Sequence, residues 1–481
     1  MWMYSYMATR RKILWVIIMA SYPLYSVEDC STFSDFLIKI NVQFGDSIAF
    51  CSKQNCWIYR DFYHEVLGLL PSFPKNAHYF YVISVTSPYK FAAVYFSVII
   101  SGNVAVLADS ENLEKLNIQE ELHMINDENI CNFYCEKEQV QLEEYKTDNQ
   151  DLCTIACSSG TTSVVKGVML SQENLLSDMV GGMRNYKYAK GDKYVNILPY
   201  THLFGIIADL LGPLYSGGVI CFSDNRLDFF HNLRYFQPTN LNLPPALVNS
   251  IFDVLRSTGN FEFATSGNLR KVMCAGASMN DNVNTLFEKY GMRVYAAYGL
   301  TECSPCVTLS RDRDYRVGSC GKTLDCCQIR IENEEVLVCG KNVMLGYYKD
   351  SEATNLVLEN GWLHTGDLGY LDEDGFLFIY GRKTNLIVFE SGYKLLPELL
   401  ESKINRIKGI KESVAISRTE QQKVRLDIMV VIDDTVKESK LKEKLRQLFG
   451  EESILEYVEN IHFTQKQIPK NKLGKIVRSG L

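Results

Sequence analysis

Short apolar runs rich in β-branched residues alternate along most of the chain with longer stretches of helical periodicity. One such run at 78–85 (HYFYVISV) precedes a helical stretch at Pro88–Ile100, which a second run at 103–109 (NVAVLAD) follows. The same order predicts helices at Gly205–Leu214 and Asn280–Lys289, each between two strand-like runs. This alternation is typical of βαβ units, in which helices connect parallel strands. The pattern therefore predicts an α/β fold with parallel sheets.

The pattern changes in the last third of the chain. From Val317 to Ile379 the strand-like runs become short and are separated by glycines, which indicates an antiparallel region. After Arg382 follow about 100 residues of alternating helix and strand, a length typical of an independent small α/β domain. Because 481 residues are too many for one compact core, two or more domains are expected.

Two apolar segments raise the question of a membrane. Basic residues at 10–12 precede a short apolar stretch at 13–20, as in a weak signal peptide, but no small-residue cleavage site follows. This stretch is too short to span a bilayer, so we expect an N-terminal extension or a packed first helix. The longer segment 91–108 is interrupted by polar residues at 97 and 101–103, which indicates a buried helix, a turn and a strand. No transmembrane segment is predicted.

The composition limits the kinds of partner that the chain is expected to bind. An apolar fraction of 46%, a charged fraction of 22% and a net charge of −7 indicate a soluble globular protein without a field that favours nucleic acid or an anionic membrane. Most of the 15 cysteines stand in apolar runs, so free thiols in a reducing, cytoplasmic compartment are expected. Cys303 and Cys306 form a CxxC motif, but no second CxxC or suitably spaced histidine pair supports a zinc site.

The segment 157–170 (CSSGTTSVVKGVML) has the composition of a phosphate-binding loop. Its small residues allow backbone N–H groups to converge on an anion, and its hydroxyl groups and Lys166 add donors. A helix-like run follows the segment, and a helix N-terminus would add partial positive charge. Lys166 precedes Gly167, whereas the lysine of a Walker A loop follows the second glycine. Taken alone, an ordinary strand–turn–helix connection is the simpler interpretation.

Four later segments change this interpretation. Individually each has a simple explanation, since Asp367 could cap a turn and Lys475 could belong to a solvated tail. The four segments are YAAYGLTECSP at 295–305, GWLHTGDLGY at 361–370, YGRKTNLIVFESGYKLLPELLE at 380–401 and IPKNKLGKIVR at 468–478. In order and spacing, these four and the segment 157–170 resemble the AMP-forming acyl-adenylate synthetases. That family includes acyl-CoA ligases, amino-acid-activating domains and firefly-type luciferases, and the resemblance extends from about Phe33 to the C-terminus.

The resemblance implies a domain arrangement. A large N-terminal α/β domain at 1–381 would combine parallel βαβ sheets with a small antiparallel or barrel region. A hinge at 382–384, with Thr384 at its centre, would lead to a small mobile α/β domain at 385–481. Rotation about this hinge would let Lys475 leave before a thiol enters.

The resemblance also implies ATP as a substrate, Mg²⁺ as the metal and a set of nucleotide-binding residues. The residues are Ser159, Gly160, Thr161, Thr162, Lys166, Gly276, Ala277, Tyr298, Gly299, Thr301, Asp367, Arg382 and Lys475. The loop residues up to Lys166 would bind the β- and γ-phosphates, and Tyr298 would stack on adenine. Thr301 would contact the α-phosphate, and Glu302 would hold the metal.

Three residues of the later segments would complete the site for ATP and for adenylation. Asp367 would bind both ribose hydroxyls with help from Arg382. Lys475 would stabilise the charge that develops during adenylation, in which a carboxylate attacks the α-phosphorus. The catalytic residues implied are Lys475, Thr301, Glu302, His202 and Lys166.

Four positions depart from the family pattern. Ser163 and Val165 stand where glycine and proline are usual, which affects the mobility of the loop and its affinity for ATP. Thr384 replaces the usual lysine or aspartate of the hinge, and Asn385 replaces a commoner acidic residue. A hinge requires permissive backbone angles more than charge, so rotation should persist.

The acyl pocket is the least determined part of the site. The segment LPYTHLFG at 198–205 matches the family motif that borders the acyl group, and His202 is the candidate residue. Relatives that activate amino acids place an aspartate near Phe204 or Gly205, and Asp209 comes a helical turn too late to pair with a substrate ammonium. α-Amino acids are therefore disfavoured, and the segments around 298–305 and 343–354 most resemble fatty acyl-CoA ligases.

Three functions stay open at this point. The chain could be an acid–thiol ligase that transfers an acyl group to CoA, or an enzyme that loads the phosphopantetheine of an acyl or peptidyl carrier protein. It could also be a degenerate nucleotide-binding protein. Several residues argue against the last alternative, namely Thr161, Lys166, Glu302, Asp367, Arg382 and Lys475.

Overall fold

The computed structural model describes residues 30–116, 118–134, 140–158, 165–186, 188–223, 228–275, 281–311, 314–420, 423–432, 436–469, 476 and 478. The chain divides into two compact units. The large unit comprises Met1–Ile329 and Val338–Leu363, and the small unit comprises Arg330–Leu337 and His364–Leu481. The expected domain boundary and hinge at 382–384 stay a prediction.

The first sheet of the large unit is mainly parallel. Its described strands follow the order β14-β13-β12-β11-β10-β8-β9-β1-β2, and only the pairs β1–β2, β12–β13 and β13–β14 are antiparallel. The strands are β1 (Ile48–Cys51), β2 (Cys56–Ile58), β8 (Lys193–Val195), β9 (Val219–Cys221), β10 (Asn240–Leu243), β11 (Lys271–Ala275), β12 (Arg293–Tyr298), β13 (Thr308–Leu309) and β14 (Lys322–Thr323).

The second sheet of the large unit has the strand order β17-β7-β6-β4-β3-β5 among the described residues. Strands β6, β4, β3 and β5 are parallel, whereas β6–β7 and β7–β17 are antiparallel. The strands are β3 (Phe80–Ser84), β4 (Val104–Leu107), β5 (Leu122–Asn126), β6 (Leu152–Cys157), β7 (Gly167–Ser171) and β17 (Gly346–Tyr347).

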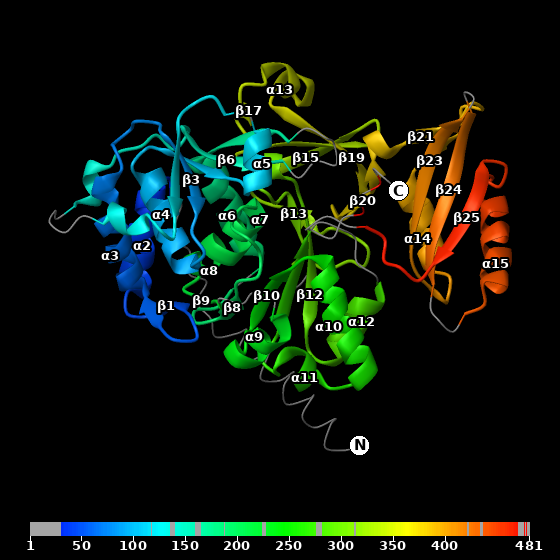
Figure 1. Ribbon diagram of the computed structural model, residues 1–481, viewed down its shortest axis with the longest axis horizontal. Coiled ribbons are helices and arrows are strands. Elements are labelled where there is room, and N and C mark those ends of the chain that lie inside the picture. Colours follow the sequence, from blue (N-terminus) through cyan, green and yellow to red (C-terminus); the bar gives the residue numbers. More distant parts are fainter. Residues whose placement is uncertain are drawn as a thin grey trace. The chain divides into compact units, whose positions relative to one another are not determined.

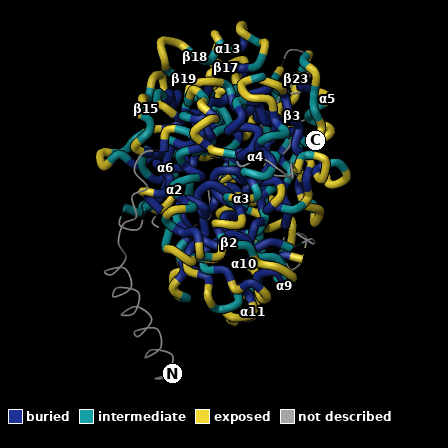
Figure 2. Tube along the Cα trace, turned by 90° about the vertical axis from the view of Figure 1, so that its left-hand side faces the viewer, coloured by how far each residue is buried: buried dark blue, intermediate teal, exposed yellow. Residues whose placement is uncertain are grey.

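Helices lie on these sheets (Figure 1), as expected where an apolar helix face packs on an apolar sheet face. Helix α4 (Pro88–Ile100) is buried along almost all of its length, and Ser87 caps its N-terminus. Figure 2 shows the buried residues in the interior, with exposed turns outside. The other helices are α2 (Phe33–Phe44), α3 (Tyr59–Leu69), α5 (Ser110–Lys115), α6 (Gln172–Tyr186), α7 (Leu203–Ile206), α8 (Gly212–Tyr215), α9 (Phe229–Phe236), α10 (Pro245–Thr258), α11 (Phe261–Thr265), α12 (Asp281–Lys289) and α13 (Ser351–Val357). Short 3₁₀ turns are η1 (Leu70–Ser72), η2 (Ile130–Phe133) and η3 (Leu142–Glu144).

The small unit holds a three-stranded sheet covered by two helices. Strand β24 (Lys423–Ile432) pairs antiparallel with β23 (Ile410–Glu420) and parallel with β25 (Val458–Thr464). Helices α14 (Pro397–Asn405) and α15 (Glu438–Glu451) share one apolar core with these strands, as their positions in Figure 1 illustrate. A short pair, β21 (Ile387–Val388) and β22 (Lys394–Leu395), joins the same core.

The boundaries between the two units fall within three strands of the chain. These are β15 (Cys327–Glu332), β16 (Glu335–Gly340) and β19 (Trp362–Leu371). β19 pairs antiparallel with β18 (Leu358–Glu359) and with β20 (Leu377–Arg382). The expected antiparallel region is confirmed by these pairs.

The three predicted βαβ units are confirmed. The expected helix Pro88–Ile100 lies between the parallel strands β3 and β4. The helix expected at Gly205–Leu214 is a run of α7, η4 (Ile207–Leu211, π-helical) and α8 between the parallel strands β8 and β9. α12 connects β11 and β12, which are also parallel. The N-terminal segment up to residue 29 lies outside the described residues.

Two expectations require correction. The helix-like run after the segment 157–170 is confirmed as α6, but β7 pairs with β6 in an antiparallel hairpin and separates the loop before Gly167 from that helix. A helix N-terminus therefore does not lie at the end of this loop. Cys51 and Cys56 face one another across β1 and β2 and form a disulfide, whereas the other described cysteines are free as expected. No helix among the described residues is long and apolar enough to cross a membrane.

Candidate active site

In the large unit, Lys166 and Glu302 both contact Tyr347, one at the ring and the other at the hydroxyl group. The ammonium group of Lys166 lies 4.6 Å from the centre of the Tyr347 ring. The Tyr347 hydroxyl donates a hydrogen bond of 2.9 Å to Oε1 of Glu302. The ring face attracts the cation while the hydroxyl binds the carboxylate. A basic and an acidic candidate from distant parts of the sequence are thus brought together.

Backbone pairing fixes this arrangement. Strand β17, which carries Tyr347, pairs with β7, so Tyr347 stands opposite Val168 at the end of the loop that contains Lys166. The N–H of Met344 donates to the carbonyl oxygen of Glu302 at 2.9 Å. Glu302 itself lies in η5 (Thr301–Cys303), three residues after β12 has ended. Three separate segments of the chain are therefore needed to form the contact.

Tyr347 is a residue that the sequence interpretation missed. Burial, and next the negative charge of Glu302, raise the pKa of Tyr347 well above its ordinary value. The hydroxyl therefore stays protonated at neutral pH and donates to Glu302. The only sequence signal was the segment NVMLGYYKDSEAT at 342–354, in which no particular tyrosine was distinguished.

The hairpin loop between β6 and β7 is closed by Ser158 and Lys166. The N–H of Ser158 donates to the carbonyl oxygen of Lys166 at 2.9 Å, and the N–H of Lys166 donates to Oγ of Ser158 at 3.2 Å. These bonds set the base of the predicted triphosphate loop. The predicted phosphate ligands Ser159, Gly160, Thr161 and Thr162 lie outside the described residues, as does Ser163.

The predicted adenine and α-phosphate residues follow β12. Tyr298 ends this strand and is buried, and Thr301 is half-buried at the start of η5. Gly299 allows a close approach of two backbone segments, because a Cβ there would lie 1.9 Å from the carbonyl oxygen of Pro305. The predicted adenine residues Gly276 and Ala277 lie outside the described residues.

His202, the acyl-pocket candidate, stands immediately before α7. Its N–H donates to the carbonyl oxygen of Pro199 at 3.1 Å, which closes a tight turn. Buried Asp209 holds the segment between β8 and this turn, because Oδ2 accepts hydrogen bonds of 3.1 Å from the N–H groups of Ile197 and Leu198. Its other oxygen accepts from Asn242 at 2.9 Å. Asp209 thus binds groups of the chain, in agreement with the expectation that it does not await a substrate ammonium.

In the small unit, Asp367 and Arg382 form a close pair. Arg382 Nε donates to Oδ1 of Asp367 at 2.7 Å, and the two residues lie opposite one another in the pairing of β19 with β20. Asp367 was expected in a turn, but it lies within the ten-residue strand β19. Gly366, with φ of +70°, distorts the strand immediately before it, which explains the glycine-rich appearance of the segment.

The hinge and tail residues are only partly described. Exposed Thr384 lies in η6 (Lys383–Asn385), directly after β20. Asn385 donates to Oε1 of Glu398 on α14. Lys475 lies outside the described residues. Near it in sequence, Arg478 binds both oxygens of buried Glu401 at 2.6 and 2.7 Å.

The CxxC motif carries no reactive thiol. Burial raises the pKa of both Cys303 and Cys306 well above the ordinary thiol value, so neither is a ready thiolate. Within the described part of the chain, no group of three or more His, Cys, Asp or Glu side chains is placed to hold a metal ion. A single carboxylate such as Glu302 suits Mg²⁺, which keeps several water ligands and binds largely through substrate phosphates.

Comparison with protein families gives a direct result. Residues 93–348, more than half of the chain, match the family described as AMP-binding enzyme. The chain belongs to this family. The resemblance found in the segments of the sequence is thereby confirmed.

Relatives of this AMP-binding enzyme include several bacterial ligases. The 2-succinylbenzoate–CoA ligase of Bacillus cereus strain Q1 is 30% identical over 346 residues, which cover 69% of this chain and 70% of the relative. The corresponding ligase of Bacillus cereus strain AH820 is 30% identical over 359 residues, or 72% of each chain.

Solved structures share the fold at lower identity. The O-succinylbenzoate coenzyme A synthetase of Bacillus subtilis, in complex with ATP and magnesium ion, superposes with a TM-score of 0.76 at 20% identity over 93% of this chain and 98% of that one. An anthranilate CoA ligase in complex with anthranoyl-AMP gives 0.75 at 17% identity over 95% and 97% of the two chains. The predicted α/β fold class is confirmed by this likeness.

Proposed function

We propose that this protein joins a carboxylic acid to CoA through an acyl-AMP intermediate. The observation that carries the proposal is the contact of Lys166 and Glu302 through Tyr347, found in a chain that belongs to the AMP-binding enzyme family. The relatives described above are named as CoA ligases, which supports CoA over a carrier protein as the acceptor.

The reaction has two steps in this proposal. An oxygen of the substrate carboxylate attacks the α-phosphorus of ATP, and pyrophosphate leaves. The thiolate of CoA then attacks the acyl carbon, a thioester forms, and AMP leaves with the oxygen that the carboxylate had supplied. Both partners of the first step are anions, so cationic groups must neutralise charge as it shifts.

Residues of the chain divide this work. Lys166, with the loop residues Ser159, Thr161 and Thr162, would bind the phosphates that leave as pyrophosphate. Glu302 would hold Mg²⁺, which when bound supplies positive charge to the phosphate oxygens. Tyr347 would orient the Glu302 carboxylate through its hydroxyl group. Thr301 would contact the α-phosphate.

The ribose and the base would be held by other residues. Asp367 is buried and already paired with Arg382, so its carboxylate is fixed for binding the two ribose hydroxyls. Tyr298 and Gly299, with Gly276 and Ala277, would border adenine. These assignments rest on the family resemblance and on the position of each described residue.

For the acid, we propose an aromatic carboxylic acid such as 2-succinylbenzoate, with fatty acids as the second candidate. The names of the 30%-identical relatives support the aromatic acid. The fatty acid is supported by the resemblance of the segments around 298–305 and 343–354 to fatty acyl-CoA ligases. Since Asp209 is occupied by the chain, no acidic group is offered there to an α-ammonium. His202 would border the acyl group.

The test is acid-dependent exchange of labelled pyrophosphate into ATP. A panel should contain 2-succinylbenzoate, anthranilate, benzoate, and saturated fatty acids of increasing length, each assayed with CoA and then with a phosphopantetheinylated carrier protein. We expect exchange with an aromatic acid and thioester formation with CoA. Absence of exchange with every acid would contradict the ligase assignment, and transfer only to the carrier protein would contradict CoA as the acceptor.

Lys475 provides a second test, since its proposed role is confined to the first step. Lys475→Ala should reduce pyrophosphate exchange by about 10²–10³-fold, the range expected for loss of one group that stabilises developing charge. The variant should still convert supplied acyl-AMP and CoA into thioester at a rate near that of the wild type. Intact exchange in Lys475→Ala would contradict the role.

A further inference from the structure

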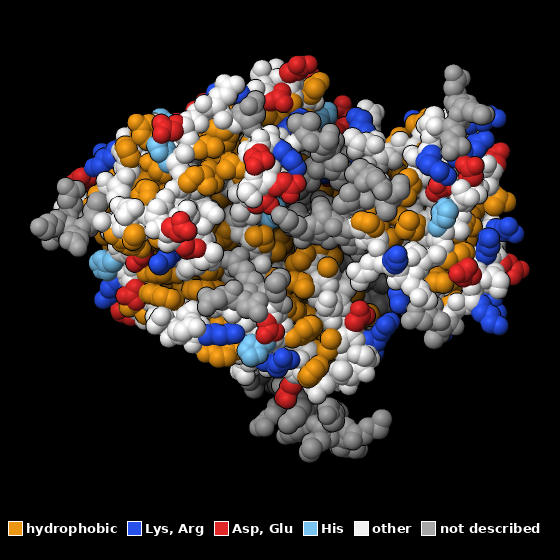
Figure 3. All heavy atoms as spheres, in the orientation of Figure 1, with side chains coloured by type: hydrophobic (Ala, Val, Ile, Leu, Met, Phe, Trp, Pro, Cys, Tyr) orange, Lys and Arg blue, Asp and Glu red, His pale blue; other side chains and the backbone are white. Residues whose placement is uncertain are grey.

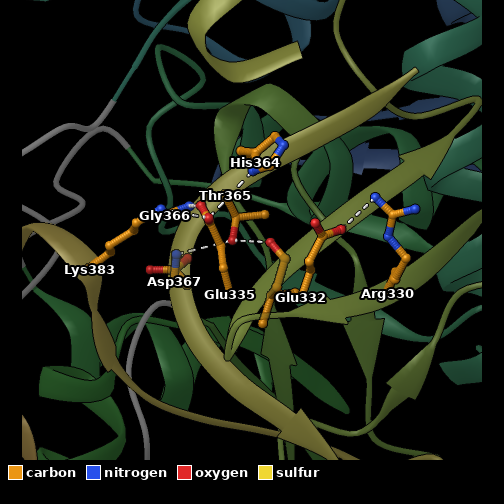
Figure 4. A network of polar contacts seen from close by, with 9 residues as sticks. Arg330, Glu332, Glu335, His364, Thr365, Gly366, Asp367 and Lys383 are labelled. Carbon is orange, nitrogen blue, oxygen red and sulfur yellow. Dashed lines mark hydrogen bonds and ion pairs between the residues drawn. The ribbon is translucent and has the colours of Figure 1, made fainter. Parts of the chain in front are cut away.

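Glu335 is a buried carboxylate that contacts two functionally different segments of the small unit. It is the first residue of β16, and its side chain is only 9% exposed. Oε1 accepts a hydrogen bond of 3.1 Å from the N–H of Gly366, and Oε2 lies 3.0 Å from Nζ of Lys383. His364 Nδ1 lies 3.4 Å from the same Oε2. Figure 4 shows these groups converging on the carboxylate.

The first contact shapes the segment that carries Asp367. Gly366 immediately precedes Asp367 and has a φ of +70°, a conformation open to glycine, and the hydrogen bond to Glu335 supports the backbone at this point. The adjacent residue of β16 adds to this support, because the carbonyl oxygen of Val336 accepts from Oγ1 of Thr365 at 2.7 Å. Oγ1 of Thr365 in turn accepts from the N–H of Asp367 at 3.1 Å. Two consecutive residues of β16, Glu335 and Val336, therefore hold the two residues that precede Asp367.

The second contact reaches the hinge. Lys383 follows Arg382 and directly precedes Thr384, so the ion pair with Glu335 fixes the last residue before the proposed pivot. On the other side of Thr384, Asn385 donates to Glu398 of α14. Thr384 thus lies between a residue bound to β16 and a residue bound to α14.

Energetic considerations favour a specific role for this carboxylate. Burial disfavours the charged form of Glu335, but Lys383, His364 and the N–H of Gly366 together lower its pKa below the ordinary value. A buried carboxylate that keeps its charge must keep its partners. By contrast, the nearby pair Arg330–Glu332, also drawn in Figure 4, is about half exposed on both sides. Exposed pairs of that kind contribute little.

We propose that Glu335 is a positioning residue that fixes the Asp367 segment and the start of the hinge to one another, so that rotation begins at Thr384 and not earlier. This inference rests on the proposed function for the roles of Asp367 and Thr384. Through Gly366, Glu335 would hold the residue that binds ribose. Through Lys383, it would keep the segment before the pivot still while the domain after the pivot turns.

Amide hydrogen exchange of the purified full chain tests the proposal without any assay of activity, since exchange reports local opening. Glu335→Gln keeps an acceptor for Gly366 but replaces the oxygen that faces Lys383, and Lys383→Met removes the same ion pair from the other side. Both should raise exchange about five- to tenfold at 384–386 and leave 366–368 near the wild-type rate. Glu335→Ala should raise exchange in both segments. Glu332→Gln, the matched control on β15, should change neither.

The KM for ATP in pyrophosphate exchange supplies the functional readout. It should rise about tenfold in Glu335→Ala, with kcat changed less than KM, and stay within about twofold in Glu332→Gln. Unchanged exchange at 384–386 in both Glu335→Gln and Lys383→Met would overturn the proposal. An equal rise throughout the small unit would also overturn it, because it would indicate only a loss of stability. If the wild type shows no acid-dependent activity, the proposed function fails, while the hydrogen exchange still decides the role of Glu335.

Discussion

The two groups of candidate nucleotide residues are held in different ways. In the large unit, Lys166 and Glu302 are linked by the single side chain of Tyr347. In the small unit, Asp367 is held by Arg382 and by the network of Thr365, Gly366 and Glu335. The proposed reaction also gives the two groups different tasks. Charge on the phosphates moves as pyrophosphate leaves, whereas the ribose is the same before and after.

A group that stabilises charge developing in the transition state acts on the rate, and a group that binds an unchanging part of the substrate acts on ground-state affinity. Substitutions in the first group should therefore act mainly on the rate of adenylation. Substitutions in the second should act mainly on the affinity for ATP. Acidic and basic side chains of the described residues are interspersed on the face shown in Figure 3.

The largest effect is expected for Glu302→Gln. The amide oxygen can still accept from Tyr347, so the variant removes charge while keeping the shape of the contact. We expect the rate of pyrophosphate exchange at saturating ATP to fall about 10²–10³-fold, as for loss of one electrostatic stabiliser. Glu144→Gln, which alters an exposed ion pair with Lys75, is the control and should keep the wild-type rate. A change confined to the KM for ATP would contradict the expectation that the first group acts on the rate of adenylation.

Asp367→Asn should have the next largest effect, and on a different parameter. Loss of a charged hydrogen bond of about 1.5–3 kcal/mol corresponds to an increase of roughly 10–100-fold in the KM for ATP. Initial rates over a range of ATP concentrations measure this change, with Asp374→Asn in the exposed turn after β19 as the control. A fall in kcat with unchanged KM would contradict a role in ground-state binding.

Tyr347→Phe should have a smaller effect, because it keeps the ring beneath Lys166 and removes only the hydroxyl group. A lost neutral-to-charged hydrogen bond should lower the exchange rate by up to about tenfold and raise the Mg²⁺ concentration needed for half-maximal rate. Titration of the rate with Mg²⁺ checks both changes. The control is Tyr370→Phe, whose exposed ring stacks on Phe378. An unchanged Mg²⁺ requirement would show that Tyr347 does not orient Glu302.

The smallest effect concerns pH. The pKa of Glu335 is lowered in the folded state, so its ion pair stabilises the fold fully above the ordinary glutamate pKa and loses this contribution as the pH falls through the folded-state value. The difference in urea midpoint between the wild type and Glu335→Gln should therefore shrink as the pH falls from about 5 through the folded-state pKa. A difference that grows toward low pH would contradict the assigned direction.

Sequence patterns predicted the βαβ units because the spacing of apolar residues within each unit matches the residues that become buried, as in α4 between β3 and β4. They predicted neither the hairpin at Lys166 nor the place of Asp367 within β19, because those strands are defined by partners elsewhere in the chain. Tyr347 and Glu335 were missed for the same reason. Glu302 lies 45 residues from Tyr347 and Lys383 lies 48 residues from Glu335 in sequence, and only the folded chain brings them into contact.

The most direct measurement follows the oxygen of the substrate. An acid that supports pyrophosphate exchange should be labelled with ¹⁸O in its carboxylate and converted with ATP and CoA. If the carboxylate attacks the α-phosphorus, mass spectrometry will find one ¹⁸O in the AMP released and none in pyrophosphate. Label in pyrophosphate or phosphate, or thioester formation without labelled AMP, would contradict the acyl-AMP route.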